Sequence, residues 1–183
     1  PIGGEAVGAT VFGIWQVLQK ASLRICMLDG RSAEVLKWIV ASKQYDDDLI
    51  AKQRALSSAL VVLLLFFPVL ALVFGLFIVF IPDYLALEGA AAQQARLVVI
   101  LLGAASVIMA AALLFEAVIR GSNLAFKLLG FQALVLVSGG IMSALTVASG
   151  NGLIGLAYVQ IIVSTLFLMA YLFTAKKHIV WLG

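Results

Sequence analysis

One long uncharged stretch of the chain runs from residue 55 to residue 82, between Arg54 and Asp83. A helix over residues 57–81 alone would be about 37 Å long, because each residue of an α-helix adds about 1.5 Å. The hydrocarbon core of a bilayer is about 30 Å thick, and a β-barrel strand crosses it with far fewer residues. This stretch therefore predicts a transmembrane α-helix, and it excludes a small soluble domain.

Four further segments are apolar enough to predict spans, so we expect an all-α, polytopic transmembrane helix bundle with five spans. Only 11% of the residues are charged and 64% are hydrophobic, whereas about a quarter of the residues of a soluble domain are charged. A single cysteine, Cys26, excludes a disulfide within the chain and a zinc site built from cysteines. The predicted spans cover 9–29, 57–81, 96–118, 124–148 and 153–175, with tight turns at 120–123 and 148–152.

The connection over residues 30–56 is the charge-rich part of the chain. Apolar residues recur at helical spacing in its first half, which predicts an amphipathic helix at the membrane interface. Asp48 is the expected N-cap of the helix that enters the second span. Nine lysines and arginines fall in this connection, after the third span and at the C-terminal end, against Arg96 alone on the other side. By the positive-inside rule, 30–56 and the C-terminal end are cytoplasmic, and the N-terminal end of the chain lies outside.

Two cations interrupt the first predicted span, Lys20 and Arg24. Together they cost about 5–7 kcal/mol at the centre of a membrane helix, and the apolar residues of the span return only about 4 kcal/mol. Arg24 lies close enough to the span's end for its side chain to reach the membrane interface. It is therefore either an interfacial anchor or a ligand-binding residue. Lys20 lies deeper, on one helical stripe with Gln16 and Arg24, so we expect this stripe to line a cationic cavity that binds an anion.

Weaker candidates lie in the later spans. Glu116 and Arg120 have the i, i+4 spacing of an ordinary helix ion pair, and they are also candidate coupling or gating residues. Small polar residues of spans four and five either line a cavity or hydrogen-bond neighbouring helices, and the second interpretation is the more common one. Those residues are Gln132, Ser138, Ser143, Thr146, Gln160, Ser164 and Thr165.

The acidic run Asp46, Asp47 and Asp48 is the one sequence feature that suggests an enzyme. Membrane prenyltransferases hold Mg²⁺-diphosphate between paired acidic motifs, but this chain has no second acidic run to face the first. No P-loop, GxGxxG or serine-hydrolase pattern is present either. We therefore expect no enzymatic activity, no metal site, no cofactor and no nucleic-acid partner.

Several stretches resemble the polysaccharide-biosynthesis flippases of the multidrug/oligosaccharidyl-lipid/polysaccharide exporter superfamily. "VGATVFGIWQVLQK" followed by "LDGRSAEVLKWIVASKQYDD" is similar to that family's second helix and first cytoplasmic loop, with Gly30 one place earlier than in the family pattern. "IPDYLALEGAAAQQARLVVILLG" resembles its outer loop and fourth helix, and "FEAVIRGSNLAFKLLGFQAL" its next helical connection. "GNGLIGLAYVQIIVSTLFL" resembles its sixth helix.

The resemblance implies helices two to six of a larger transporter in the bacterial cytoplasmic membrane, with the first helix and the second half outside this chain. It implies a flippase that carries an undecaprenyl-diphosphate-linked oligosaccharide, such as an O-antigen or exopolysaccharide unit, to the outer leaflet by alternating access. Lys20, Arg24 and Gln16 would then bind the diphosphate, and Na⁺ or H⁺ would be a candidate coupling ion. Three alternatives stay open: a multidrug antiporter of the same superfamily, a membrane subunit without transport activity, and a prenyl-phosphate enzyme.

Overall fold

The computed structural model describes residues 13–22, 24, 32–43 and 48–179, which form helices and turns with no strand among them. Residues 13–22 are helical, followed by α2 (Ser32–Ser42), α3 (Leu49–Tyr84), α4 (Gly89–Gly121), α5 (Phe126–Ala148) and α6 (Gly152–His178). The all-α prediction is thereby confirmed for the described part of the chain. Of the span predicted at 9–29, the structure describes residues 13–22 and Arg24, and the rest lies outside the described residues.

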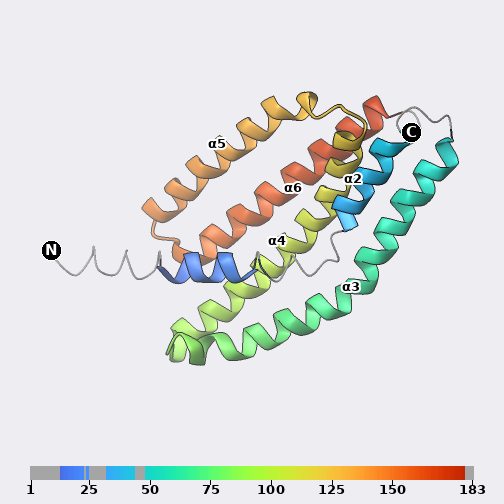
Figure 1. Cartoon of the computed structure of the whole chain (residues 1–183). Coiled ribbons are helices and arrows are strands. Elements are labelled where there is room, and N and C mark those ends of the chain that lie inside the picture. Colours follow the sequence, from blue (N-terminus) through green and yellow to red (C-terminus); the bar gives the residue numbers. More distant parts are fainter. Residues whose placement is uncertain (1–12, 23, 25–31, 44–47, 180–183) are drawn as a thin grey trace.

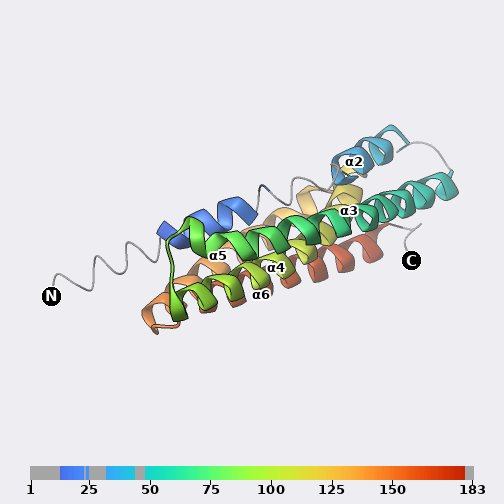
Figure 2. The ribbon, with the colours of Figure 1, turned by 90° about the horizontal axis from the view of Figure 1, so that it is seen from below.

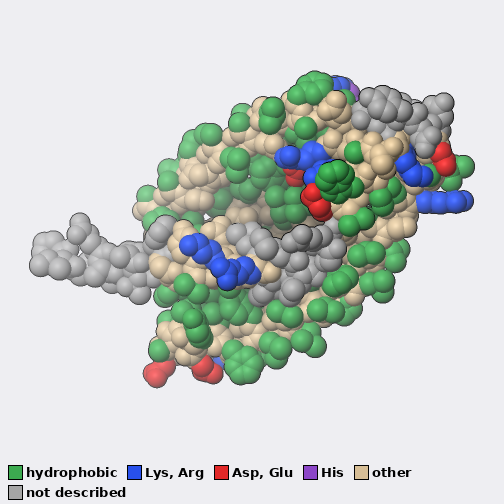
Figure 3. Space-filling model, in the orientation of Figure 1, with side chains coloured by type: hydrophobic (Ala, Val, Ile, Leu, Met, Phe, Trp, Pro, Cys, Tyr) green, Lys and Arg blue, Asp and Glu red, His purple; other side chains and the backbone are tan. Residues whose placement is uncertain are grey.

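The four long helices lie side by side in the order α5, α6, α4, α3, which we call the helix layer (Figure 1). Each is long and apolar enough to cross a membrane, and each overlaps one of the spans predicted from residue 57 onward. The chain is a multi-span membrane protein. Large apolar side chains remain exposed along α3 and α5, and Figure 3 shows hydrophobic side chains over the outer surface of the layer, as expected for helices that face lipid.

The turns between the long helices bring their charged ends together. Leu49, Gly121, Phe126 and His178 lie at one end of the helix layer, which we call the basic end (Figure 1). The tight turns form as predicted, because residues able to adopt a positive φ occupy them: Asn123 after α4, and Gly150 and Gly152 between α5 and α6.

The start of α3 confirms the predicted cap. The Asp48 carboxylate accepts a hydrogen bond of 2.9 Å from the backbone N–H of Ala51, which satisfies one of the free donors at a helix N-terminus. The helix then continues through Pro68, near its midpoint, and Figure 1 shows that α3 is curved along its length. At 36 residues, α3 is longer than a bilayer requires, so its basic first turns extend past the hydrocarbon.

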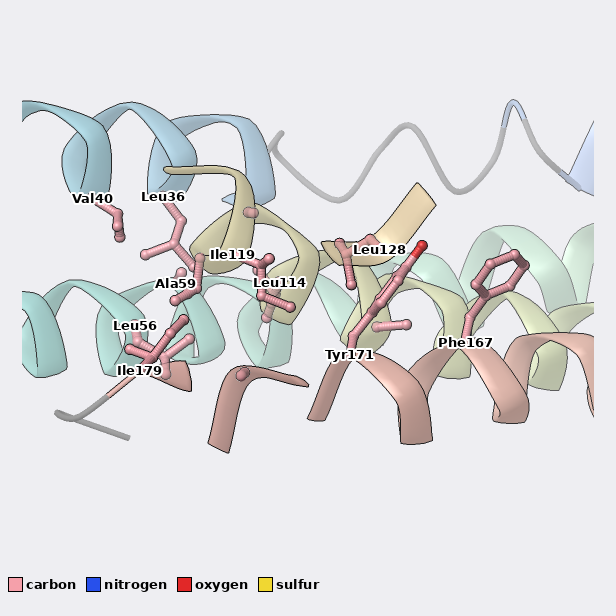
Figure 4. Close-up of a cluster of buried hydrophobic side chains, with 14 of the residues drawn as sticks. Leu36, Val40, Leu56, Ala59, Leu114, Ile119, Leu128, Phe167, Tyr171 and Ile179 are labelled. Atoms are coloured by element: carbon pink, nitrogen blue, oxygen red, sulfur yellow. The ribbon is translucent and has the colours of Figure 1, made fainter. Parts of the chain in front are cut away.

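Residues 13–22 and α2 both lie on the same broad face of the helix layer (Figures 1 and 2). Trp15 and Leu18 pack with apolar side chains of α3, α4 and α6 at the end opposite the basic end. Leu36 and Val40 of α2 pack into a second cluster at the basic end, which draws on α2 to α6 (Figure 4). The other side of α2 carries Trp38, which is 67% exposed, so α2 is amphipathic as predicted.

Candidate functional site

A buried carboxylate lies near the basic end of the helix layer. Glu116 of α4 is only 8% exposed, and its Oε1 lies 2.6 Å from a terminal guanidinium nitrogen of Arg120. The Nε of Arg120 donates to the same oxygen at 2.7 Å. The pair is the i, i+4 ion pair predicted from the sequence. Its two members differ in environment, because the Arg120 side chain is 49% exposed while that of Glu116 is 11% exposed.

Two side chains from neighbouring helices extend this pair into a network. Gln132 of α5 donates from Nε2 to Glu116 Oε1 at 3.2 Å and to the hydroxyl of Tyr171 at 2.8 Å. Tyr171 projects from α6 with its hydroxyl directed away from that helix (Figure 4), and the residue is 2% exposed. We call Glu116, Arg120, Gln132 and Tyr171 the polar network, and it joins three of the four long helices.

The polar network lies a short way inside the helices. Glu116 is five residues from the end of α4, Gln132 six from the start of α5, and Tyr171 seven from the end of α6. These separations correspond to depths of about 7–11 Å from the basic end. A carboxylate at such a depth requires a cation and hydrogen-bond donors, because an unpaired charge in a medium of low polarity is costly. Arg120 and Gln132 supply both.

The predicted cationic stripe lies elsewhere, on the segment that crosses the broad face. Gln16 is half-buried, whereas Lys20 and Arg24 are exposed. Figure 3 shows Lys and Arg side chains gathered over this segment, and a second group over α2 and the end of α4. The face is hollowed beside the segment, between it and α5. The structure therefore places Lys20 and Arg24 on the surface of a hollowed face and keeps them apart from the polar network.

Four of the small polar residues bond within their own helix, so the prediction that such residues bond to neighbouring helices is wrong for these four. The hydroxyls of Ser138, Ser143, Thr146 and Thr165 each donate to a backbone carbonyl of their own helix. Ser164 is 1% exposed and its hydroxyl has no hydrogen-bond partner among the described residues. Gln132 is the exception, since it bonds across to two other helices.

Sequence reasoning missed one member of the polar network, Tyr171. Its hydroxyl is one of several polar groups in an apolar helix, and no spacing rule links it to a residue 39 or more positions away. A signal was available, however, because a buried tyrosine hydroxyl usually has a hydrogen-bond partner. The antiparallel hairpin brings this tyrosine of span five and the glutamine of span four to similar depths, but which helix faces meet depends on the tertiary structure.

Of the acidic run, the structure describes Asp48 alone. Asp48 caps α3, and Asp46 and Asp47 lie outside the described residues. Nowhere in the described ranges do three or more His, Cys, Asp or Glu side chains come together in a way that could hold a metal ion.

Comparisons with protein-family models, curated protein sequences and solved structures produced no match to this chain. Its function must therefore be inferred from its own residues and geometry.

Proposed function

We propose that this protein is a flippase that moves a polyprenyl-diphosphate-linked oligosaccharide across the bacterial cytoplasmic membrane by alternating access. The observation that carries the proposal is the position of Lys20 and Arg24. Both are exposed on a segment lying across the hollowed face of membrane-spanning helices. The resemblance of several stretches to the polysaccharide flippases supports the same interpretation.

The chemistry of the cargo fits two cations at this position. A diphosphate carries several acceptor oxygens and at least two negative charges, which Lys and Arg bind through charge-assisted hydrogen bonds. Such pairs are stronger in surroundings less polar than water. The polyprenyl tail needs no protein pocket, because it can remain in lipid beside the exposed apolar helices.

The polar network has a separate role in this proposal. Alternating access requires groups of helices that move as units while others move against them. Bonds from Gln132 to Glu116 and to Tyr171 hold α4, α5 and α6 together at the basic end. Glu116 and Arg120 then act as gating residues, and release of the bond between Gln132 and Glu116 would loosen α4 from α5.

The test is a flipping assay with the protein reconstituted in liposomes that contain a fluorescent polyprenyl-diphosphate glycan. Lys20→Glu should slow the rate at which the probe reaches the outer leaflet about tenfold or more, because a bond to a charged group contributes about 1.5–3 kcal/mol. Arg96→Glu removes an exposed cation in the first turns of α4 and should leave the rate unchanged. An unchanged rate with Lys20→Glu, at equal protein content, would reject the cavity role.

One observation favours a second candidate, the multidrug antiporter. Such a protein binds cationic drugs, and a buried carboxylate such as Glu116 is the type of residue that it would use. Everted membrane vesicles that contain the protein should extrude ethidium if this alternative is correct, and Glu116→Gln should abolish the extrusion. The flippase proposal expects no ethidium extrusion with either form.

A further inference from the structure

The α5–α6 corner of the basic end carries two lysines and a histidine, and neither lysine has an acidic partner among the described residues. Lys127 is the second residue of α5, while Lys177 and His178 are the last two of α6, and all three are exposed. The ion pairs among the described residues are Glu34–Lys37 and Glu116–Arg120, so neither Lys127 nor Lys177 pairs with a carboxylate there. A concentration of positive charge of this kind attracts an anion.

Hydrogen-bond geometry at the corner leaves donors available to such an anion. Lys127 Nζ lies 3.0 Å from His178 Nδ1. An ammonium group can only donate, so Nδ1 accepts and the ring keeps its hydrogen on Nε2. Two further ammonium hydrogens of Lys127 and the Nε2–H of His178 therefore remain to bind oxygen atoms of a phosphate.

Exposed aromatic rings accompany both lysines. Lys127 Nζ lies 5.9 Å from the ring centre of Phe126, and Lys177 Nζ lies 5.9 Å from that of Phe173. The two rings are 65% and 69% exposed. Phenylalanine rings in these positions give the cations an apolar neighbour on the side that faces lipid.

An apolar stripe of α6 leads directly to Lys177. Ile162, Leu166, Met169 and Phe173 are exposed and follow the i, i+4, i+7, i+11 spacing of one helix face. The stripe is about 16 Å long, close to the roughly 15 Å thickness of one leaflet of the hydrocarbon core. An acyl chain laid along this stripe would bring its headgroup to the level of Lys177.

We propose that this corner binds the headgroup of an anionic phospholipid, with Lys127, Lys177 and His178 on the phosphate and an acyl chain along the α6 stripe. The occupant is a lipid of the surrounding membrane, and it is distinct from the transported cargo. The inference does not depend on the proposed function, because it requires neither flipping nor the residues of the segment 13–22.

Native mass spectrometry of the full chain in detergent tests the proposal. Phosphatidylglycerol and phosphatidylcholine with identical acyl chains are added separately, and glycerol 3-phosphate serves as a headgroup without a tail. The wild type should retain phosphatidylglycerol at least tenfold better than phosphatidylcholine. Equal retention of the two lipids, or displacement of phosphatidylglycerol by an equal concentration of glycerol 3-phosphate, would overturn the proposal.

Matched variants locate the site. Lys127→Gln and Lys177→Gln should each weaken phosphatidylglycerol retention about fivefold, the equivalent of about one lysine near an anionic surface. Lys176→Gln removes the same charge from the same helix end but from a residue outside the group, and it should have little effect. An equal loss with Lys176→Gln would mean that only diffuse charge attracts the lipid, and the proposed site would be rejected.

A charge-conserving variant separates binding from folding. The double variant Lys127→Arg/Lys177→Arg keeps both cations and should retain phosphatidylglycerol within about threefold of the wild type. If it loses the lipid as fully as the glutamine variants while its circular dichroism spectrum is unchanged, the proposed site is wrong.

Discussion

Glu116 places a negative charge among apolar helices, and its immediate neighbours make that position tolerable. Arg120 supplies the opposite charge from one turn further along α4, and it reaches the exposed side. Gln132 supplies a donor from another helix and passes a second bond to Tyr171. In membranes a bond between helices contributes modestly, about 0.6 kcal/mol on average. We therefore expect the polar network to stabilise the folded protein more through the joint arrangement of its members than through any single bond.

At the residue scale, we expect Tyr171→Phe to lower the free energy of unfolding by about 0.6 kcal/mol and Gln132→Leu by about 1 kcal/mol. The first change removes one bond between helices and the second removes two. Because both variants remove the Gln132–Tyr171 bond, their combination should cost less than the sum of the two. Unfolding in mixed micelles by added dodecyl sulfate measures these values.

Ser143→Ala is the control for this series, since the Ser143 hydroxyl bonds to Gly139 of its own helix. We expect Ser143→Ala to change the free energy of unfolding by close to zero. Strict additivity of Tyr171→Phe and Gln132→Leu would show that the two side chains do not act as one network.

At the scale of elements, the attachment of α2 depends on how closely it approaches the end of α4. A Cβ atom at Gly121 would lie 2.8 Å from the Lys37 carbonyl oxygen and 2.8 Å from Val40 Cβ. A backbone carbonyl cannot rotate away as a side-chain tip can, so only glycine fits there. A Cβ atom at Gly139 would lie 2.8 Å from Val163 Cγ2, in a similar approach of α5 to α6, and such approaches at small residues are common between membrane helices.

Gly121→Ala should therefore displace α2 from the helix layer. We expect the free energy of unfolding to fall by about 1–3 kcal/mol, which is typical of overpacking at a close contact. Hydrogen–deuterium exchange of residues 32–42 should become faster, with little change in α5. Gly130→Ala is the matched control, because a Cβ at Gly130 meets no atom within 4 Å. Unchanged exchange of α2 in Gly121→Ala would contradict the close packing of the two helices.

At the scale of the whole molecule, the hairpin arrangement places most of the charge at one end. The basic end carries basic side chains of α2, the start of α3, the end of α4, the start of α5 and the end of α6. Arg96 lies near the opposite end, together with Asp83 and Glu88. By the positive-inside rule, we expect the basic end to face the cytoplasm.

Cysteine labelling in intact bacterial cells tests this orientation. In a Cys26→Ser background, Ala90→Cys and Ser149→Cys should react with a membrane-impermeant maleimide added outside. Ser42→Cys and Ser122→Cys should react only after the cells are made permeable. Labelling of Ser42→Cys and Ser122→Cys in intact cells would show the opposite orientation. The diphosphate could then not enter the proposed cavity from the cytoplasm.

Much of the fold was predictable because the bilayer imposes simple rules. Long uncharged runs in lipid must be helices, because they are too long for barrel strands and only a helix satisfies its backbone hydrogen bonds within one segment. The helices from α3 onward, the Asp48 cap and the tight turns follow from residues close together in the sequence. The Glu116–Arg120 pair was predicted for the same reason, as both members lie one turn apart on a single helix.

Residue order alone thus determined which segments are helical, where they turn and which ends share the positive charge, because each depends on local backbone chemistry and hydropathy. Only the tertiary structure decided the lateral order of the helices, the closeness of α2 to Gly121 and the meeting of Gln132 with Tyr171. Lipid-facing helices have apolar residues on nearly every side, so hydropathy cannot indicate which side meets a neighbour. Close packing and a few hydrogen bonds between helices make that choice, and they form only when the helices are side by side.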